Sequence, residues 1–244
     1  LEIIQQAGVS SDQPVLEIGP GKGILTAILL EQAKSLTALE IDSKLCSVLR
    51  DRFGENKNFK LIEADALKYD YGALGSGYQV VSNLPYYAAT HILKRLIHYR
   101  KHLSHMTVML QKEVVDRLAA IPGTRDYGSL SVFIQFHCEV ERLLEVGKES
   151  FSPRPKIDSS VVKLTPLSRP KVQVDNLKTF FTIVNASFLH KRKMLKNNLK
   201  CWGNLFQKQN GKTELAGIDL NRRGETLSLE DFAILSNYIH SCND

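Results

Sequence analysis

The feature that most constrains the fold is the segment at residues 15–26, where a strand pattern runs into a glycine-rich turn and then a helix. Residues 15–18 (VLEI) form the apolar run, and three glycines with the spacing Gly-x-Gly-x-Gly follow it: Gly19, Gly21 and Gly23. Glycine permits backbone angles and close approaches that a Cβ blocks. Such a turn brings backbone N–H groups and a helix N-terminus against a ligand. The segment therefore predicts an α/β protein with a ligand site after its first strand; the alternative is a tight strand-to-helix turn of another kind.

Acidic residues mark the ends of three successive strand patterns. Glu17 lies in the first, Glu40 ends the apolar run at 35–39, and Asp65 follows the run at 59–62. Ligands bind at the carboxyl ends of parallel strands in doubly wound sheets, and an acid at the second strand bonds a ribose there. A carboxylate can accept hydrogen bonds from both hydroxyls of one sugar. We expect Glu40 to bind a ribose and Asp65 the amino group of an adenine. Each acid alone also fits a surface position at a strand end, but three in succession favour a site.

The tetrapeptide Asn83-Leu84-Pro85-Tyr86 follows a fourth strand pattern at residues 78–82. It resembles the active site of N6-adenine methyltransferases, and the glycine turn resembles the cofactor loop of methyltransferases that use S-adenosylmethionine. The exocyclic amine of adenine is a poor nucleophile because its lone pair is delocalised into the ring. We expect the Asn83 side-chain oxygen and the Leu84 carbonyl to accept the two amine hydrogens. Pro85 would fix the backbone, and Tyr86 would stack on a base lifted from its helix. The alternative is an Asn-Pro turn with a packed tyrosine.

Further motifs make the whole chain similar to one family, the ribosomal RNA adenine N6,N6-dimethyltransferases of the small subunit. Residues 121–132 (IPGTRDYGSLSV) and 151–162 (FSPRPKIDSSVV) resemble its P-G-T-x-x-Y-G-x-L-S-V and F-x-P-x-P-K-V-D-S-x-V-V segments. Further similarities lie at Phe188, at 192–199 and at 223–232. Because these motifs span nearly the whole chain in the expected order, they are far more specific than the glycine turn.

The resemblance implies an α/β fold, a Rossmann-like class I methyltransferase with a seven-stranded, mostly parallel sheet and a small all-α C-terminal domain. Alternating strands and helices up to about residue 111 predict a doubly wound sheet independently. We place the methyltransferase domain at residues 1–166 and the helical RNA-binding domain at 171–244, because Pro166 and Pro170 interrupt both periods between them. Beyond this linker an apolar stripe predicts a helix: Phe181, Val184, Phe188, Leu195 and Leu199.

The resemblance also implies roles for individual residues. S-adenosylmethionine is the expected cofactor, with contacts at Glu17, Gly19, Gly21, Gly23, Glu40, Ile41, Asp65, Ala66 and Asn83. The target adenine is expected against Asn83, Leu84, Pro85, Tyr86 and Phe151. In the family a phenylalanine at the position of Phe151 stacks on the base opposite the tyrosine; the alternative is a hydrophobic plug at a loop end.

In function, the resemblance implies dimethylation of two adjacent adenines near the 3′ end of 16S rRNA, within a pre-formed small-subunit particle. We expect a monomer that acts in the cytoplasm, or in an organelle if the source is eukaryotic. One alternative is a 23S rRNA adenine N6-methyltransferase of the macrolide-resistance type, whose motif more often has Ile at the position of Leu84. The other is a non-catalytic RNA- or DNA-binding relative, such as a mitochondrial transcription factor. The intact acids and the intact motif at 83–86 favour catalysis.

The net charge of +6 favours a polyanionic partner. We expect phosphate contacts from a basic cluster on the C-terminal helix, Lys191, Arg192, Lys193 and Lys196, and from Arg154 and Lys156 beside Phe151. The alternative for the cluster is a solvated helix face.

Four scattered cysteines without a C-x-x-C pair argue against a zinc ribbon or a disulfide framework, and we expect no metal cofactor. No apolar run is long enough to span a bilayer. Family members carry a basic N-terminal segment with a Q-N-F-L motif, which this sequence, starting at Leu1, does not contain. The resemblance implies that this segment helps to cover the cofactor and lines the target-base site, and that the fold does not depend on it.

Overall fold

The computed structural model describes residues 2–150, 157–202 and 214–242. Its contacts divide the chain into two compact units. The first comprises Leu1–Val115 and Glu139–Pro166, and the second comprises Asp116–Cys138 and Leu167–Asp244. The division after Pro166 lies beside the linker expected from the prolines.

The sequence predicted one continuous domain at residues 1–166 and a second at 171–244. The segment 116–138 departs from this prediction. In the structure it belongs to the second unit. The reason is apolar packing: Tyr127 and Phe136 lie in one buried cluster with Phe180 and Phe232, which come from the C-terminal part.

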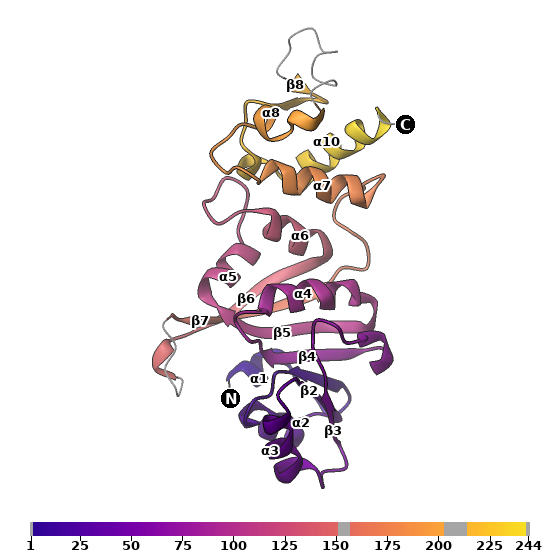
Figure 1. Ribbon diagram of the computed structural model, residues 1–244, viewed down its shortest axis with the longest axis vertical. Helices are drawn as coiled ribbons and strands as arrows, with labels where there is room; N and C mark the ends of the chain where they lie inside the picture. Colours follow the sequence, from indigo (N-terminus) through magenta and orange to yellow (C-terminus); the bar gives the residue numbers. More distant parts are fainter. Residues whose placement is uncertain (1, 151–156, 203–213, 243–244) are drawn as a thin grey trace. The chain divides into compact units, whose positions relative to one another are not determined.

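The first unit contains a seven-stranded sheet in the order β3-β2-β1-β4-β5-β7-β6 (Figure 1). Strands β1 to β5 pair in parallel, whereas β7 pairs antiparallel with β5, as the doubly wound, mostly parallel prediction requires. The order reverses between β1 and β4, and this switch point is where open α/β sheets bind ligands. The strands are β1 (Pro14–Ile18), β2 (Ser35–Glu40), β3 (Phe59–Glu63), β4 (Tyr78–Asn83), β5 (Leu103–Gln111), β6 (Cys138–Val146) and β7 (Ser159–Pro166).

Helices α1 (Glu2–Ala7), α2 (Ile24–Gln32), α3 (Ser43–Phe53), α4 (Ala89–His98) and α5 (Lys112–Leu118) alternate with these strands. Their apolar residues recur at helical spacing, as Ile92, Leu93, Leu96 and Ile97 do on the buried side of α4. Residues of α1 and α2 form a second buried cluster with Val15, Leu36 and Val81 of the sheet. This packing fixes the strands whose carboxyl ends form the site.

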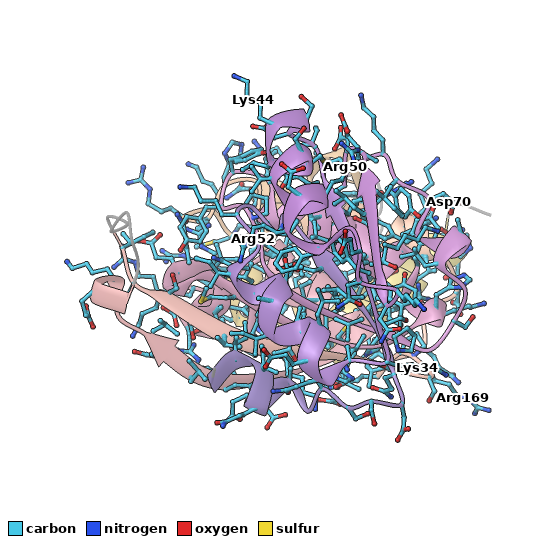
Figure 2. The ribbon with its side chains drawn as sticks, turned by 90° about the horizontal axis from the view of Figure 1, so that it is seen from below. Lys34, Lys44, Arg50, Arg52, Asp70 and Arg169 are labelled. Atoms are coloured by element: carbon cyan, nitrogen blue, oxygen red, sulfur yellow. The ribbon has the colours of Figure 1, made fainter. Side chains whose placement is uncertain are left out.

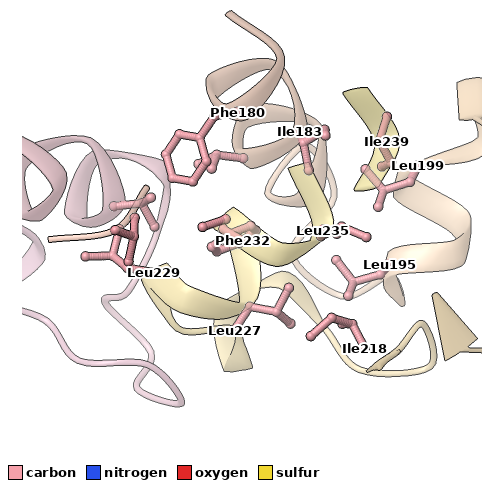
Figure 3. Close-up of a cluster of buried hydrophobic side chains, with 14 of the residues drawn as sticks. Phe180, Ile183, Leu195, Leu199, Ile218, Leu227, Leu229, Phe232, Leu235 and Ile239 are labelled. Atoms are coloured by element: carbon pink, nitrogen blue, oxygen red, sulfur yellow. The ribbon is translucent and has the colours of Figure 1, made fainter. Parts of the chain in front are cut away.

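The second unit is mainly helical, as predicted, with α6 (Ser129–His137), α7 (Leu177–Ser187), α8 (Leu195–Asn198) and α10 (Leu229–Ser241). Figure 3 shows its core, where Phe180 and Ile183 of α7, Leu195 of α8 and Phe232 of α10 meet. A capping box starts α10: the Ser228 hydroxyl accepts from Asp231 N–H, and the Asp231 carboxylate accepts from Ser228 N–H. A small hairpin, β8 (Glu214–Leu215) and β9 (Ile218–Asp219), adds strands to a domain that was predicted to be entirely helical.

The predicted C-terminal helix is broken into two helices. α7 ends at Ser187, and α8 begins at Leu195. The Asn198 side-chain amide donates to the Ser187 carbonyl at 2.8 Å and to the His190 carbonyl at 3.2 Å, so carbonyl groups at the helix end are satisfied without another helical turn. Gly224 also packs closely against the end of α7, because a Cβ there would lie 2.6 Å from the Ser187 carbonyl oxygen. The apolar stripe is therefore shared by two helices, with a turn at residues 188–194 between them.

Candidate functional site

The glycine turn after β1 has a shape that glycine adopts without strain. Gly19, Gly21 and Gly23 have φ angles of 68, 60 and 80°, all in the left-handed region. A Cβ on Gly23 would lie 2.6 Å from the Phe53 ring and 2.9 Å from Leu49, so α3 packs directly on the turn. A Cβ on Gly21 would meet no atom within 4 Å. The turn is thus closely packed at Gly23 and open at Gly21, where a ligand can approach the backbone.

The Glu40 carboxylate joins this turn to the end of β2. Its Oε1 accepts hydrogen bonds from the N–H groups of Ile41 at 2.9 Å and Asp42 at 3.0 Å, and its Oε2 accepts from Gly21 N–H at 3.2 Å. Glu40 is only 6% exposed. A carboxylate has about four lone-pair positions, so Glu40 can be held by three N–H groups and still accept from a ligand hydroxyl.

Glu17 is a buried acid beside the glycine turn. It is 2% exposed, and its Oε2 accepts a hydrogen bond from the Thr26 hydroxyl of α2 at 2.7 Å. Burial raises the pKa of Glu17 to about 7; the Thr26 hydrogen bond opposes this rise, and the Glu40 charge adds to it. Glu17 therefore exchanges its proton near neutral pH, which makes its charge responsive to a ligand bound nearby.

Asp65 and Ala66 begin the loop after β3. The Asp65 Oδ1 accepts from Leu67 N–H at 2.8 Å, and the Ala66 carbonyl accepts from the Tyr71 hydroxyl at 2.8 Å. Burial raises the pKa of Tyr71 above its usual value, so the phenol remains a donor. Ile41, next to Glu40, is 59% exposed, and Leu67 is 41% exposed. The acids at these strand ends thus have exposed apolar side chains beside them in the chain.

Asn83 lies at the end of β4, where its side chain is exposed, while Leu84 is buried at 1% exposure. Leu84 N–H donates to the Met109 carbonyl of β5 at 3.2 Å, and Ala88 N–H donates to the Pro85 carbonyl at 3.0 Å. These bonds hold the backbone of the tetrapeptide in a turn that leaves the Asn83 amide available to a substrate. The Tyr86 hydroxyl is 2.7 Å from the Ser159 hydroxyl of β7, which orients the half-buried ring.

Ser82 brings the glycine turn and the tetrapeptide together. Its hydroxyl accepts from Ile18 N–H at 2.6 Å and donates to the Ile18 carbonyl at 2.8 Å, which joins the ends of β1 and β4. A Cβ on Gly19 would lie 3.5 Å from Cδ of Pro85, so the two segments are in contact distance. We call the resulting group the strand-end site: Glu17, Gly19, Gly21, Gly23, Glu40, Asp65 and Asn83 to Tyr86.

Three contacts of the strand-end site were not expected from the sequence: those of Thr26, Ser82 and Ser159. Each is a small hydroxyl residue. The partners of Ser82 and Ser159 are far away in the chain, and Thr26, in the first turn of α2, bonds back to Glu17 of β1. The only local signal was the position of Ser82 next to Asn83 and of Ser159 inside the motif at 151–162.

Three of the four predicted RNA contacts of the second unit lie in a turn instead of on a helix. Lys191, Arg192 and Lys193 are exposed in the turn at residues 188–194, which we call the basic turn. Lys196 lies in α8, where its ammonium group donates to the Asn221 side-chain oxygen at 2.8 Å. The sequence pattern predicted that these basic residues lie on one continuous helix. They do not, because α7 ends at Ser187. The predicted contacts at Phe151, Arg154 and Lys156 lie outside the described residues.

Within the described ranges, no group of three or more His, Cys, Asp or Glu side chains is arranged to hold a metal ion. Of the helices in those same ranges, none combines the length and the apolar character needed to cross a bilayer.

Comparisons with known proteins agree with the geometry. The model of the family described as ribosomal RNA adenine dimethylase matches residues 1–241. The chain is 43% identical over 242 residues to Ribosomal RNA small subunit methyltransferase A of Clostridium botulinum, covering 98% of this chain and 88% of that protein. It is also 43% identical over 249 residues to the protein of the same name from Geobacillus thermodenitrificans, covering 97% of this chain and 84% of that one.

Solved structures have the same architecture. A dimethyladenosine transferase from Plasmodium falciparum is similar with a TM-score of 0.75 and 26% identity, covering 96% of this chain and 92% of that one. The 23S rRNA methyltransferase ErmE is similar with a TM-score of 0.72 and 24% identity, covering 98% and 95%. At that identity the likeness to ErmE concerns the fold alone.

Proposed function

The chain belongs to the ribosomal RNA adenine dimethylase family, and from this premise we propose that it transfers methyl groups from S-adenosylmethionine to two adjacent adenines near the 3′ end of 16S rRNA, giving N6,N6-dimethyladenine. The observation that supports this most is the contact between the glycine turn and the tetrapeptide at the β1–β4 switch point. A donor site and an acceptor site are then adjacent, as in-line group transfer requires.

The residues present fit S-adenosylmethionine. Glu40 would accept from the ribose hydroxyls, and Asp65 from the adenine amino group, while Ile41 and Ala66 would lie against the adenine ring. The open space at Gly21 and the exposed Ile41 side chain support this assignment, because the first admits the cofactor to the backbone and the second gives its base an apolar surface. When bound, the cofactor supplies a methyl group on a positively charged sulfur, which is an activated leaving group.

The chain's own residues would position the target amine. The Asn83 side-chain oxygen and the Leu84 carbonyl accept its two hydrogens, which turns the nitrogen lone pair toward the methyl group. The Tyr86 ring, held through Ser159, stacks on the flipped base. On accepting the methyl group the amine nitrogen would become positive, the cofactor's sulfur would keep the electron pair of the broken S–C bond, and the amine would then release one proton to water. No strong base is needed, so positioning and electrostatics would supply most of the rate.

The partner in this proposal is 16S rRNA within a small-subunit particle, which matches the names of the bacterial relatives at 43% identity. We propose that the chain acts as a monomer in the cytoplasm, where those bacteria assemble ribosomes. The 23S alternative is supported by the ErmE fold alone, at 24% identity.

The test is methyl transfer from labelled S-adenosylmethionine to small ribosomal subunits that lack adenine dimethylation, with large subunits as the matched control. We expect label in N6,N6-dimethyladenosine near the 3′ end of 16S rRNA and none in 23S rRNA. Label in 23S rRNA alone would instead assign the chain the activity of the macrolide-resistance methyltransferases. Binding of small subunits without any transfer would make it a non-catalytic relative.

A further inference from the structure

Helix α4 starts immediately after the strand-end site and has an exposed face without acidic residues. His91, Lys94 and His98 follow the spacing i, i+3, i+7 in this helix and are exposed, and Tyr87 is exposed in the turn just before it. Residues at this spacing share one side of a helix. Lys101, also exposed, follows in the short 3-10 turn Arg100–His102. We call these five residues the α4 basic face.

The opposite side of α4 fixes the direction of this face. Ile92, Leu93, Leu96 and Ile97 are at most 2% exposed, so the helix cannot rotate without exposing them. Arg95 is used inside the unit: its guanidinium donates to the Tyr69 carbonyl at 3.0 Å and lies 5.0 Å from the centre of the Tyr99 ring. Arg95 thus ties α4 to the loop that carries Asp65.

The composition of this region is unusual for the chain. Residues 71–112 contain no Asp or Glu, although the whole chain has 26 acids among 244 residues. The same stretch contains Lys94, Arg95, Arg100, Lys101 and Lys112, and four of the seven histidines: His91, His98, His102 and His105. By contrast, α3 contains Asp51 among its basic residues. Figure 2 shows Arg50 and Arg52 among the side chains of that surface.

The face also begins with an aromatic side chain at the target-base position. Tyr87 is 84% exposed and directly follows Tyr86. An exposed aromatic ring followed by exposed lysines is a combination that binds single-stranded nucleic acid, because bases stack on the ring and phosphates contact the ammonium groups. α4 is about 15 Å long, so Lys94 near its middle and Lys101 beyond its end lie along a path that leads away from the strand-end site.

We propose that the α4 basic face binds the RNA strand that flanks the target adenine, with a neighbouring base on Tyr87 and phosphates along Lys94 and Lys101. This inference rests on the proposed function, since it takes the strand-end site as the place where the target base is held. It adds a surface in the first unit to the RNA contacts predicted in the second.

The test compares two double variants of the full chain. Lys94→Gln/Lys101→Gln removes two charges from the α4 basic face. Lys34→Gln/Lys57→Gln removes two charges from exposed lysines that precede β2 and β3, at the sheet edge opposite the strand-end site; Figure 2 labels Lys34. Affinity for small subunits lacking dimethylation, and for their naked 16S rRNA, is measured from low to high salt, and S-adenosylmethionine binding is measured in parallel to verify folding.

We expect the α4 variant to lower RNA affinity about tenfold at low salt and to reduce the slope of log affinity against log salt by about 1.4, at about 0.7 per lost phosphate contact with a single strand. Tyr87→Ala should lower affinity with little change in slope, whereas Tyr87→Phe should retain it. The inference is overturned if the α4 and control variants behave alike. It is also overturned if the α4 variant loses affinity for whole subunits but not for naked rRNA, because the face would then contact a ribosomal protein. Binding is measured without turnover, so a failure of methyl transfer in the wild-type chain would count against the proposed function and leave this test intact.

Discussion

The strand-end site and the basic turn differ in what holds their side chains. In the strand-end site, Glu40 accepts from three backbone N–H groups and Ser82 joins two strands. In the basic turn, Lys191, Arg192 and Lys193 are exposed on a short connection between two helices. Under the proposed function, this difference predicts that the first region acts by geometry, so that a lost contact changes the chemistry, and the second by charge, so that a lost contact changes only affinity. Each prediction below would break or sharpen that distinction.

The largest effect is expected from Asn83→Ala. The variant loses the side-chain oxygen that holds the target amine, so we expect the rate of methyl transfer at saturation to fall about 100- to 1,000-fold. Binding of S-adenosylmethionine, measured by calorimetry, should change little. Asn83→Asp keeps an acceptor oxygen and should retain more of the rate; equal rates for the two variants would remove Asn83 from its proposed role.

Glu17→Gln should change how stability depends on pH. The Glu17 pKa is raised from 4.5 to about 7 in the folded chain, so the folded state binds more protons than the unfolded state between these values. The free energy of unfolding contributed by this group therefore falls as pH rises from 4.5 to about 7, by about 3 kcal/mol, and is level above that. Gln keeps an acceptor for Thr26 without the charge, so the variant should lack this fall and be more stable at pH 8.

Denaturant unfolding at pH 5 and pH 8 measures this directly. Glu63→Gln is the matched control, since Glu63 ends β3 of the same sheet but its side chain is 42% exposed. A wild-type chain and a Glu17→Gln variant with parallel stability curves would show that Glu17 is ionised throughout.

Glu40→Gln should weaken S-adenosylmethionine binding about 10- to 100-fold, the size expected for a hydrogen bond to a charged group. The reason is that an amide has one acceptor oxygen where the carboxylate has two, so the three backbone N–H groups and the ribose hydroxyls would compete for it. Titration calorimetry with Glu63→Gln as control tests this. If both variants bind equally well, the acid at the end of β2 is a structural cap of the turn and not a cofactor ligand.

The smallest effect per residue is expected in the basic turn. Replacing Lys191, Arg192 and Lys193 by Gln should reduce the salt slope of rRNA binding by about 2, at about 0.7 per contact. The rate at saturating RNA should not change. An unchanged slope would mean that the turn is a solvated surface, and a lower saturated rate would mean that it helps to position the base.

The sequence was sufficient to predict the sheet and the residues at its carboxyl edge. In a parallel sheet each strand must end at the same edge, so Glu17, Glu40 and Asn83 are brought together once their strands are identified. The glycine spacing likewise predicted a turn whose φ angles are now seen at Gly19, Gly21 and Gly23. Both predictions rest on local sequence patterns, and each pattern fits only one backbone arrangement.

The remaining features depend on contacts between distant residues. Nothing near Ser187 ends the apolar period, and α7 stops there because Asn198 and Gly224 pack on its last turn. The segment 116–138 joins the second unit because Phe136 finds its apolar partners at Phe180 and Phe181. Hydroxyl groups such as those of Ser82 and Ser159 are too common in sequences to predict without their partners.

One measurement tests the central distinction most directly: single-turnover methyl transfer over a range of small-subunit concentrations for Asn83→Ala and for the triple variant of the basic turn. We predict that Asn83→Ala lowers the maximal rate and keeps the half-saturating concentration, whereas the triple variant raises the half-saturating concentration and keeps the maximal rate. The account would be contradicted if Asn83→Ala changed only the half-saturating concentration. It would also be contradicted if the triple variant lowered the maximal rate as strongly as Asn83→Ala does, because the two regions would then not differ in role.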